Sequence, residues 1–306
     1  MGNFSFSRLS TYNQCPKKHR YMYEEKIYTE GNEFLTLGDI FHKCIDAYYK
    51  GESYEPFLSD YETKVAAGTL STEQGMMREV VERYIDYYEP DEEIIASELR
   101  IEEEWEDGDK FTAIIDRIVS NDGLITIRDT KTTQSALSYT TNQVKFNTQL
   151  LTYCSVVQEN LNMNVDIYEI DEVRLAKIQP VPLNANGKPT ADKKRLGLVL
   201  KEDYYNKLCE LGLENEPEYY GVLDYLEKRG HPLFNRTKCH LLDQNILAAN
   251  LEDIAQTYEK IKLNHDNRVR GKLCDYCPYQ ELCNLDFYLP DDQDRQMLIN
   301  KIKKSS

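Results

Sequence analysis

The sequence predicts a mixed α/β domain in which a central sheet is flanked by helices. Apolar residues recur at helical spacing in residues 7–88, strand-like runs follow in 94–130, and a further helix and strand come next. The chain has 306 residues, of which 41% are hydrophobic and 29% charged, so it is long enough for one large domain or two modest ones. Because no run of 18 apolar residues is present, we expect no membrane-spanning helix.

The elements follow in chain order from their periodicity. Helices are expected at 7–27, 37–48, 71–88, 144–160, around 201–228 and at 247–263. Strands are expected at 94–101, 111–119, 124–130 and 165–178. The sequence Asn121-Asp122-Gly123 predicts a hairpin turn between the second and third strands. Residues 180–195, rich in proline and asparagine, predict a loop.

The net charge of −16 is unevenly distributed along the chain. Residues 86–109 hold twelve acidic side chains and one arginine, so this segment carries −11 of the total. Basic clusters lie at 17–20, 193–195, 260–272 and 301–304. The total charge argues against a nucleic-acid partner, because nucleic-acid-binding domains usually carry a basic face. A local basic field can still bind phosphate, so the distribution leaves that class open.

Acidic residues occupy positions on the predicted hairpin that should be buried. Asp116 lies between Ile114 and Ile118 on one face, and Asp129 continues the apolar face of Ile125 and Ile127. An unpaired buried charge costs several kcal/mol, so these carboxylates need a cationic side chain or a metal ion as a partner.

The turn predicts how the two carboxylates face each other. If Val119 pairs with Leu124, Asp116 and Asp129 are diagonal neighbours with Cβ atoms roughly 7 Å apart. Two carboxylates at that spacing can bind one divalent cation, and Lys131 on the same face can orient an attacking water. The alternative is a salt-bridged strand end in which Lys131 simply neutralises Asp129.

Three helical residues are further candidates. His42 lies at the edge of the apolar stripe of 37–48, where a histidine is either solvated or a metal ligand. Gln149 and Tyr153 are four residues apart and therefore share a face of the helix at 144–160. Alone, none of the three indicates a function.

The eight cysteines include one compact cluster. Cys274, Cys277 and Cys283 form a C-x2-C-x5-C pattern, which is typical of a metal site. Thiolate sites usually need four sulfurs, and Cys15, followed by Pro16, is the natural fourth ligand. Zn2+ and an iron–sulfur cluster both accept four cysteines, and either would join the two ends of the chain. The N-terminus lacks a signal peptide, so a disulfide framework is not expected.

Taken together, these motifs resemble the PD-(D/E)XK nuclease superfamily. Within it, they resemble the RecB-like branch that carries a [4Fe-4S] cluster, to which AddB-type nucleases and CRISPR-associated RecB-like exonucleases belong. The matching segments are Ser7–Leu9 with Tyr12 and Cys15-Pro16, Gly38–His42, Ile115–Ile118, Ile127–Thr132, Gln149–Tyr153 and the cysteine trio. Each is short, but six in the family's order are specific. The strand motif reads Asp129-x-Lys131 where much of the superfamily has Glu-x-Lys.

The resemblance implies a restriction-endonuclease-like core and a role for each motif. The implied ligands of Mg2+ or Mn2+ are His42, Asp116, Asp129, the Thr130 carbonyl and Glu98, which matches a glutamate that the family often carries upstream. The implied catalytic residues are Asp116, Asp129, Lys131, Gln149 and Tyr153. The implied cluster ligands are Cys15, Cys274, Cys277 and Cys283. The basic residues expected to contact DNA are Lys17, Lys18, Arg20, Arg268, Arg270 and Lys272.

The resemblance also implies a single nuclease domain over 1–306, with segments 1–30 and 264–290 joined by the [4Fe-4S] cluster. Residues 36–160 would form the catalytic core and about 180–260 an insertion or accessory helical region. We expect a cytoplasmic exonuclease of a bacterial, archaeal or phage-infected cell, acting on single-stranded DNA or DNA ends in repair, recombination, CRISPR adaptation or phage DNA metabolism. No helicase motif such as G-x4-G-K-[ST] is visible, so we expect a stand-alone nuclease and not a helicase–nuclease. The expected partners are DNA and a helicase, recombination or CRISPR protein, and no membrane is expected. The alternative is a non-cleaving, cluster-stapled DNA-binding or assembly factor.

Overall fold

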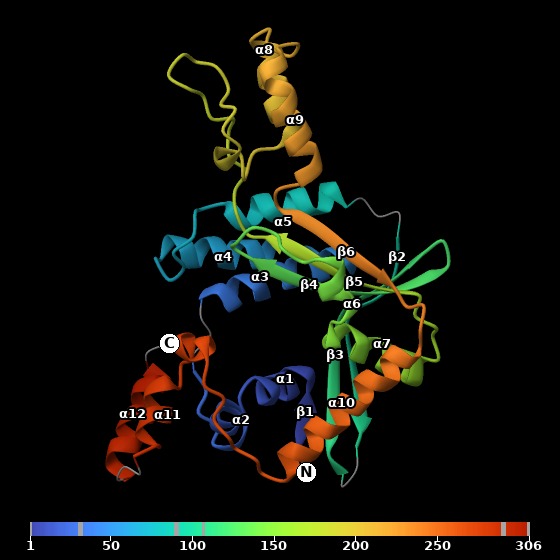
Figure 1. The fold of residues 1–306 in the computed structure, drawn as a ribbon, viewed down its shortest axis with the longest axis vertical. Helices are drawn as coiled ribbons and strands as arrows, with labels where there is room; N and C mark the ends of the chain where they lie inside the picture. The colour runs from blue at the N-terminus through green and yellow to red at the C-terminus, as the bar shows by residue number, and fades with distance from the viewer. Residues whose placement is uncertain (1, 30–32, 89–91, 106–107, 289–291, 305–306) are drawn as a thin grey trace.

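A six-stranded mixed sheet forms the centre of the protein (Figure 1). The computed structural model describes residues 2–29, 33–88, 92–105, 108–288 and 292–304. The strands are β1 (Asn3–Ser5), β2 (Glu93–Glu104), β3 (Lys110–Asn121), β4 (Leu124–Thr133), β5 (Ile167–Arg174) and β6 (Phe234–His240). They lie in the order β1-β3-β4-β5-β6, and β2 also pairs with β3. The predicted α/β class with a mixed sheet is confirmed.

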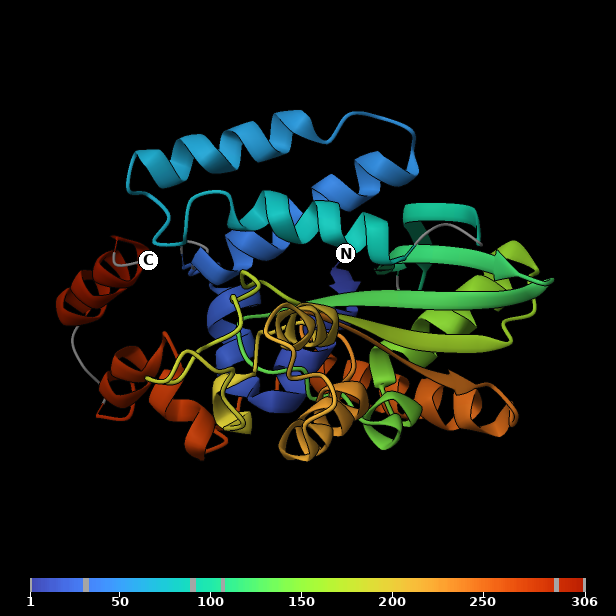
Figure 2. The same cartoon turned by 90° about the horizontal axis from the view of Figure 1, so that it is seen from above.

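Helices cover both faces of the sheet (Figure 2). On one face lie α3 (Glu33–Tyr49), α4 (Glu55–Ala66) and α5 (Met76–Tyr87), whose core includes Leu37, Phe41, Tyr84 and Val173 of β5. On the other face lie α6 (Thr141–Lys145), α7 (Thr148–Leu161) and α10 (Asn245–Lys262). The predicted continuous helix at 144–160 is wrong, because Asn147 is extended and caps α7 by accepting a bond from Leu150 N–H. None of the described helices is both long and apolar enough to cross a membrane.

The two ends of the chain pack against each other (Figure 1). The N-terminal elements are α1 (Phe6–Gln14), α2 (Pro16–His19) and the π-helical turn η1 (Arg20–Glu24). The C-terminal elements are the 3-10 turn η4 (Lys272–Tyr276), α11 (Gln280–Leu285) and α12 (Asp292–Lys304). Tyr279 donates to the Ile27 carbonyl at 2.7 Å, and Tyr21 donates to Asp286 at 2.8 Å. The predicted continuous helix at 7–27 is wrong, because Cys15 is extended ahead of Pro16, which starts a new helix.

Residues 178–233, which we call the arm, project from one end of the sheet (Figure 1). The arm contains the 3-10 turn η3 (Lys193–Arg195), α8 (Lys201–Glu210) and α9 (Pro217–Arg229), and it has a small apolar core of its own. Of the range 180–260 expected as an accessory region, β6 and α10 instead pack with the central sheet.

The hairpin between β3 and β4 has a tighter turn than predicted. Asp122 and Gly123 both adopt positive φ, at 51° and 81°, and Asn121 pairs directly with Leu124. Such a two-residue turn matches the right-handed twist of the strands. The predicted pairing of Val119 with Leu124 is therefore wrong by two residues.

Candidate active site

A gap along one edge of β3 creates the site. This edge pairs with β1 at residues 110–112 and with β4 at 117–121, and no strand pairs with it between those segments in the described chain. Asp116 lies in this gap, next to the last paired residue, Arg117. Its Oδ2 accepts a hydrogen bond of 2.7 Å from the backbone N–H of Thr130. The end of the β3–β4 ladder thus leaves the Asp116 carboxylate between the two strands.

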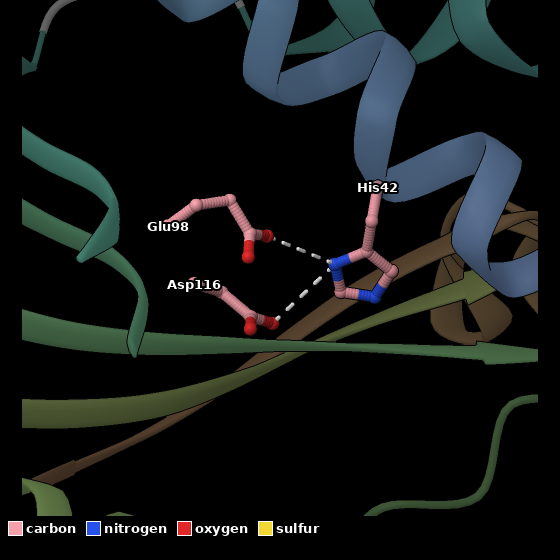
Figure 3. Close-up of side chains that lie close together, drawn as sticks. All are labelled: His42, Glu98 and Asp116. Atoms are coloured by element: carbon pink, nitrogen blue, oxygen red, sulfur yellow. Dashed lines mark ion pairs between the residues drawn. The ribbon is translucent and has the colours of Figure 1, made fainter. Parts of the chain in front are cut away.

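Three potential metal ligands converge at this point (Figure 3). The ligand atoms of His42, Glu98 and Asp116 all lie within 4.8 Å of one another. His42 Nδ1 is 3.7 Å from a carboxylate oxygen of each acid. A cavity of about 10 Å3 lies among these side chains, close to the least volume that one water molecule needs.

Local backbone features bring His42 and Glu98 to the site. His42 is one helical turn after Gly38 on α3, and a Cβ added at Gly38 would lie 2.8 Å from Thr132 Oγ1 of β4. A glycine therefore allows α3 to approach the sheet closely. Glu98 lies opposite Asp116 in the β2–β3 register and adopts the left-handed conformation at φ 49°, which costs roughly 1–2 kcal/mol in a non-glycine residue. Strain of this kind often marks a functional position.

A second group of side chains lies beside these ligands. Asp129 is 1% exposed, and its Oδ2 lies 2.7 Å from Lys131 Nζ. Lys131 also donates to Gln149 Oε1 at 2.9 Å, and Gln149 Nε2 donates to the Tyr153 hydroxyl at 2.9 Å. Residues of β4 and α7 are thereby joined in one hydrogen-bonded chain that holds the lysine in place.

Burial and neighbouring charges shift the pKa values of both groups. Burial raises the pKa of Asp129 to about 6; Lys131 lowers it and Asp116 raises it further. Burial lowers the pKa of Lys131, but the charge of Asp129 outweighs this and raises it, so the lysine stays cationic. Burial also lowers the pKa of His42, yet its bond with Glu98 and the charge of Asp116 produce a net rise.

A buried ionic network adjoins the site, and its members Arg117 and Thr130 line the same small cavity as the three potential ligands. Arg117, 3% exposed, donates to Thr130 Oγ1 and lies 3.5 Å from Asp171, which is fully buried. Arg128, 1% exposed, pairs with Glu169 and with Glu92. Since Thr130 N–H binds Asp116, Arg117 helps to hold the backbone that orients a site carboxylate. The sequence pattern contained no signal for this network beyond charges on strands.

The four cysteines of the sequence motif line one cavity. Cys15, Cys274, Cys277 and Cys283 surround a space of about 560 Å3 between the N- and C-terminal elements. Arg268 Nε donates to Cys283 Sγ at 3.3 Å. Among the described residues, no three of these sulfurs lie within 4.8 Å of one another.

The basic residues expected to contact DNA differ in their surroundings. Lys17 and Arg20 both form ion pairs with Asp266, at 3.1 and 2.6 Å. Lys18, Arg268 and Arg270 line the cysteine cavity, and Lys272 is exposed at the start of η4. The guanidinium groups of Arg268 and Arg270 lie 5.6 and 5.3 Å from the Phe287 ring centre.

The structure combines a mixed sheet with a group of acids at a break in strand pairing and a lysine beside them. A comparison against protein families gives the superfamily that the sequence motifs resemble. The model of the PD-(D/E)XK nuclease superfamily matches residues 3–284. The chain belongs to this superfamily. Its members are nucleases that use divalent metals and act on DNA, and the acidic group at His42, Glu98 and Asp116 provides a candidate metal site for this nuclease. A search of curated proteins gives no significant match.

The structure thus places the sequence-predicted residues in two neighbouring groups. His42, Glu98 and Asp116 form one group, and Asp129, Lys131, Gln149 and Tyr153 form the other. The ion pair between Lys131 and Asp129 agrees with the salt-bridged strand end considered as an alternative. It coexists with the carboxylate cluster, because Asp116 is directed to His42 and Glu98.

Proposed function

We propose that this nuclease is a metal-dependent deoxyribonuclease that works as an exonuclease on single strands or DNA ends. The observation that carries the proposal is the convergence of His42, Glu98 and Asp116 beside the Asp129–Lys131 pair. Carboxylate oxygens suit Mg2+ and Mn2+, and an imidazole nitrogen adds a ligand that transition metals accept. The donor set and the small cavity therefore fit a divalent ion bound by His42, Glu98 and Asp116.

The surrounding residues have separate tasks in this proposal. A bound divalent ion would polarise the scissile phosphate and lower the pKa of a water molecule. Asp129 and the Thr130 carbonyl lie on the adjoining strand as additional oxygen donors. Lys131, held between Asp129 and Gln149, would orient the attacking water and offset the charge that develops on the phosphate. Tyr153 fixes the orientation of the Gln149 amide.

Single carboxylate replacements test the proposal. Asp116→Asn should remove at least 99% of hydrolysis of end-labelled DNA with Mg2+ or Mn2+, since a ligand is lost while the Thr130 bond can persist. Asp122→Asn is the matched control, because it changes an exposed carboxylate on the same hairpin and asparagine tolerates positive φ. Full activity of Asp116→Asn would refute the site, and lack of cleavage by the wild type would favour a DNA-binding or assembly factor.

Circular single-stranded DNA separates exonuclease from endonuclease activity. An enzyme that requires an end leaves the circle intact and degrades the same sequence after linearisation. Comparing linear single-stranded and double-stranded substrates labelled at either end then gives strand preference and polarity. Degradation of the circle at the rate of the linear form would contradict the exonuclease proposal.

We further propose that the cysteine cavity binds a [4Fe-4S] cluster, as in the RecB-like branch. Four cysteines line this one cavity of about 560 Å3, which leaves room for a polynuclear centre. Lys17, Lys18, Arg268 and Arg270 line the cavity and would offset the charge of the thiolates. Such a centre would staple the chain ends together, and its role would be mainly structural.

Cysteine replacements test the cluster. Cys15→Ser should reduce the iron and sulfide content of anaerobically purified protein and its visible charge-transfer absorption. Cys209→Ser is the control, because Cys209 is an exposed cysteine outside the cavity. Stoichiometric zinc in place of iron, or unchanged metal content in Cys15→Ser, would contradict the cluster or its fourth ligand.

A further inference from the structure

The arm carries an exposed basic loop. Residues 183–195, which we call the basic loop, contain Lys188, Lys193, Lys194 and Arg195 but only one acid, Asp192. The four basic residues are all exposed. Asp192 caps η3 by accepting a bond of 3.0 Å from Lys194 N–H. A chain with a net charge of −16 thus presents a local excess of positive charge on its most projecting segment (Figure 1).

The lysines described in the arm fall into two groups, those on the helices that form ion pairs and those in the basic loop that do not. On its helices, Lys201, Lys207 and Lys228 each form an ion pair with an acidic residue of the arm. In the basic loop, none of the four cations has an acidic partner among the described residues, and Lys193 only lies over the Tyr225 ring. Exposed cations that are left unpaired in an acidic chain are available for an anion from outside.

Hydrogen bonds join the basic loop and the segment that follows it to the helices of the arm. Tyr204 donates to the Thr190 carbonyl of the loop at 2.8 Å, and Arg229 donates to the carbonyls of Leu196 and Val199 just after the loop. Leu196, Val199 and Tyr204 also belong to the apolar core of the arm, together with Leu208. The backbone that carries the basic side chains is therefore anchored to a packed core, which lowers the entropy cost of ordering the loop on binding.

The arm starts at the end of the sheet where Lys131 lies near the end of β4. In the parallel β4–β5 pair, Lys131 lies across from Glu172, and Leu175 N–H donates to the Thr133 carbonyl at 2.7 Å. The chain enters the arm only three residues later, and it returns through Leu233, whose carbonyl accepts a bond from Arg174 N–H. A long substrate bound at Lys131 can therefore continue toward the arm.

We propose that the basic loop binds the phosphates of a nucleic-acid strand that extends from the cleavage site, as a second contact away from the chemistry. The inference rests on the proposed function for its substrate. It assigns phosphate binding to Lys188, Lys193, Lys194 and Arg195, and predicts that long substrates bind more tightly than short ones. A repeating line of phosphates matches clustered, unpaired cations without requiring a particular base sequence.

Two lysine triples test the assignment with the same change in net charge. One carries Lys188→Gln, Lys193→Gln and Lys194→Gln, and the control carries Lys201→Gln, Lys207→Gln and Lys228→Gln on the same arm. Binding of labelled DNA is measured by fluorescence anisotropy over a range of salt concentrations in the Asp116→Asn background, so that cleavage does not interfere. Circular dichroism and thermal unfolding check that both triples fold.

The loop triple should weaken binding of long DNA roughly 10- to 100-fold and reduce the slope of log affinity against log salt by about 2 to 3. The control triple should leave both quantities close to the parent. With an otherwise wild-type active site, the loop triple should raise KM for long DNA and leave kcat, and the cleavage of oligonucleotides too short to reach the arm, unchanged. An unchanged slope, or equal effects of the two triples, would overturn the inference and leave the loop to another anionic partner, such as an acidic protein. A wild type that binds DNA through the loop but cleaves none would instead refute the proposed function alone.

Discussion

Replacing Lys131 with alanine tests how the buried Asp129 carboxylate is stabilised. Asp129 is 1% exposed, and Lys131 Nζ lies 2.7 Å from its Oδ2. Burial raises the pKa of Asp129 to about 6 even with the lysine present, and Lys131 is the strongest group that lowers it. Without the lysine, the pKa of Asp129 rises above 6, and ionisation at higher pH leaves a buried charge without a partner.

The resulting loss of stability depends on pH. Because the folded pKa of Asp129 lies above its unfolded value of 3.8, this carboxyl reduces stability as the pH rises through that interval, by about 3 kcal/mol in the wild type. In the variant the folded pKa of Asp129 is higher, so the pH interval over which this carboxyl reduces stability extends to higher pH. At about pH 5 the carboxyl is largely protonated in both proteins, so their unfolding free energies should differ by about 1 kcal/mol or less. At about pH 8 the variant should be less stable by roughly 3–5 kcal/mol, as when one partner of a buried ion pair is removed.

Urea denaturation at both pH values, with a chelator present, measures this difference independently of catalysis. Lys110→Ala is the control, because Lys110 is an exposed lysine on β3 and its replacement should cost about 0.5 kcal/mol or less. Adding Asp129→Asn to Lys131→Ala should remove the pH dependence, since the buried charge is gone. A variant that is equally destabilised at the two pH values would refute the role assigned to the ion pair.

Three other perturbations address the site, the N-terminal elements and the arm. Glu98→Gln should raise the concentration of Mn2+ for half-maximal hydrolysis by about tenfold or more, because a carboxylate ligand beside His42 is lost; an unchanged metal titration would exclude Glu98 as a ligand. His19 is 1% exposed, and burial lowers its pKa to about 4. The folded protein therefore resists protonation of this imidazole, and its free energy of unfolding should fall by about 3 kcal/mol as the pH drops from 6.5 toward 4. His19→Gln retains an acceptor for Arg8 and should flatten stability over that range in urea titrations; unchanged acid sensitivity would show that other groups cause it. Leu208→Ala should cost roughly 2–5 kcal/mol in the arm core and increase hydrogen exchange there, with unchanged hydrolysis of short oligonucleotides; altered exchange in the central sheet would show that the arm is not an independent core.

The sequence located the hairpin carboxylates correctly although the register was wrong. Side chains alternate with a period of two along a strand, so a shift of two residues keeps each on its face. Asp116 and Asp129 therefore stayed on one face, as expected, while their relation changed from diagonal toward direct opposition. The turn decided this, because Asp122 and Gly123 both accept positive φ and permit a two-residue connection.

Other parts of the site could not follow from periodicity. Glu98 itself adopts a left-handed backbone conformation within β2, and its carboxylate lies beside His42. A strand pattern in the sequence does not reveal such a conformation. The gap on β3 depends on β1, a strand of three residues that is too short to give a periodic signal. The arm's paired and unpaired lysines also depend on the tertiary fold, because Lys201 pairs with Glu227 across two helices.

The net charge of −16 does not prevent binding of a polyanion, because the fold distributes the charges locally. In the acidic segment 86–109, Glu92 pairs with Arg128 and Glu98 faces His42; residues 89–91 and 106–107 lie outside the described part. Acids near the site thus pair with a cation or lie where they can bind a metal ion, whereas the cations of the basic loop have no acidic partner among the described residues. Screening limits the reach of exposed charges to about 10 Å at moderate salt, so a bound strand responds to the side chains beside it and not to the total. The loop and helix triples have the same net charge, and a difference between them would measure this local effect directly.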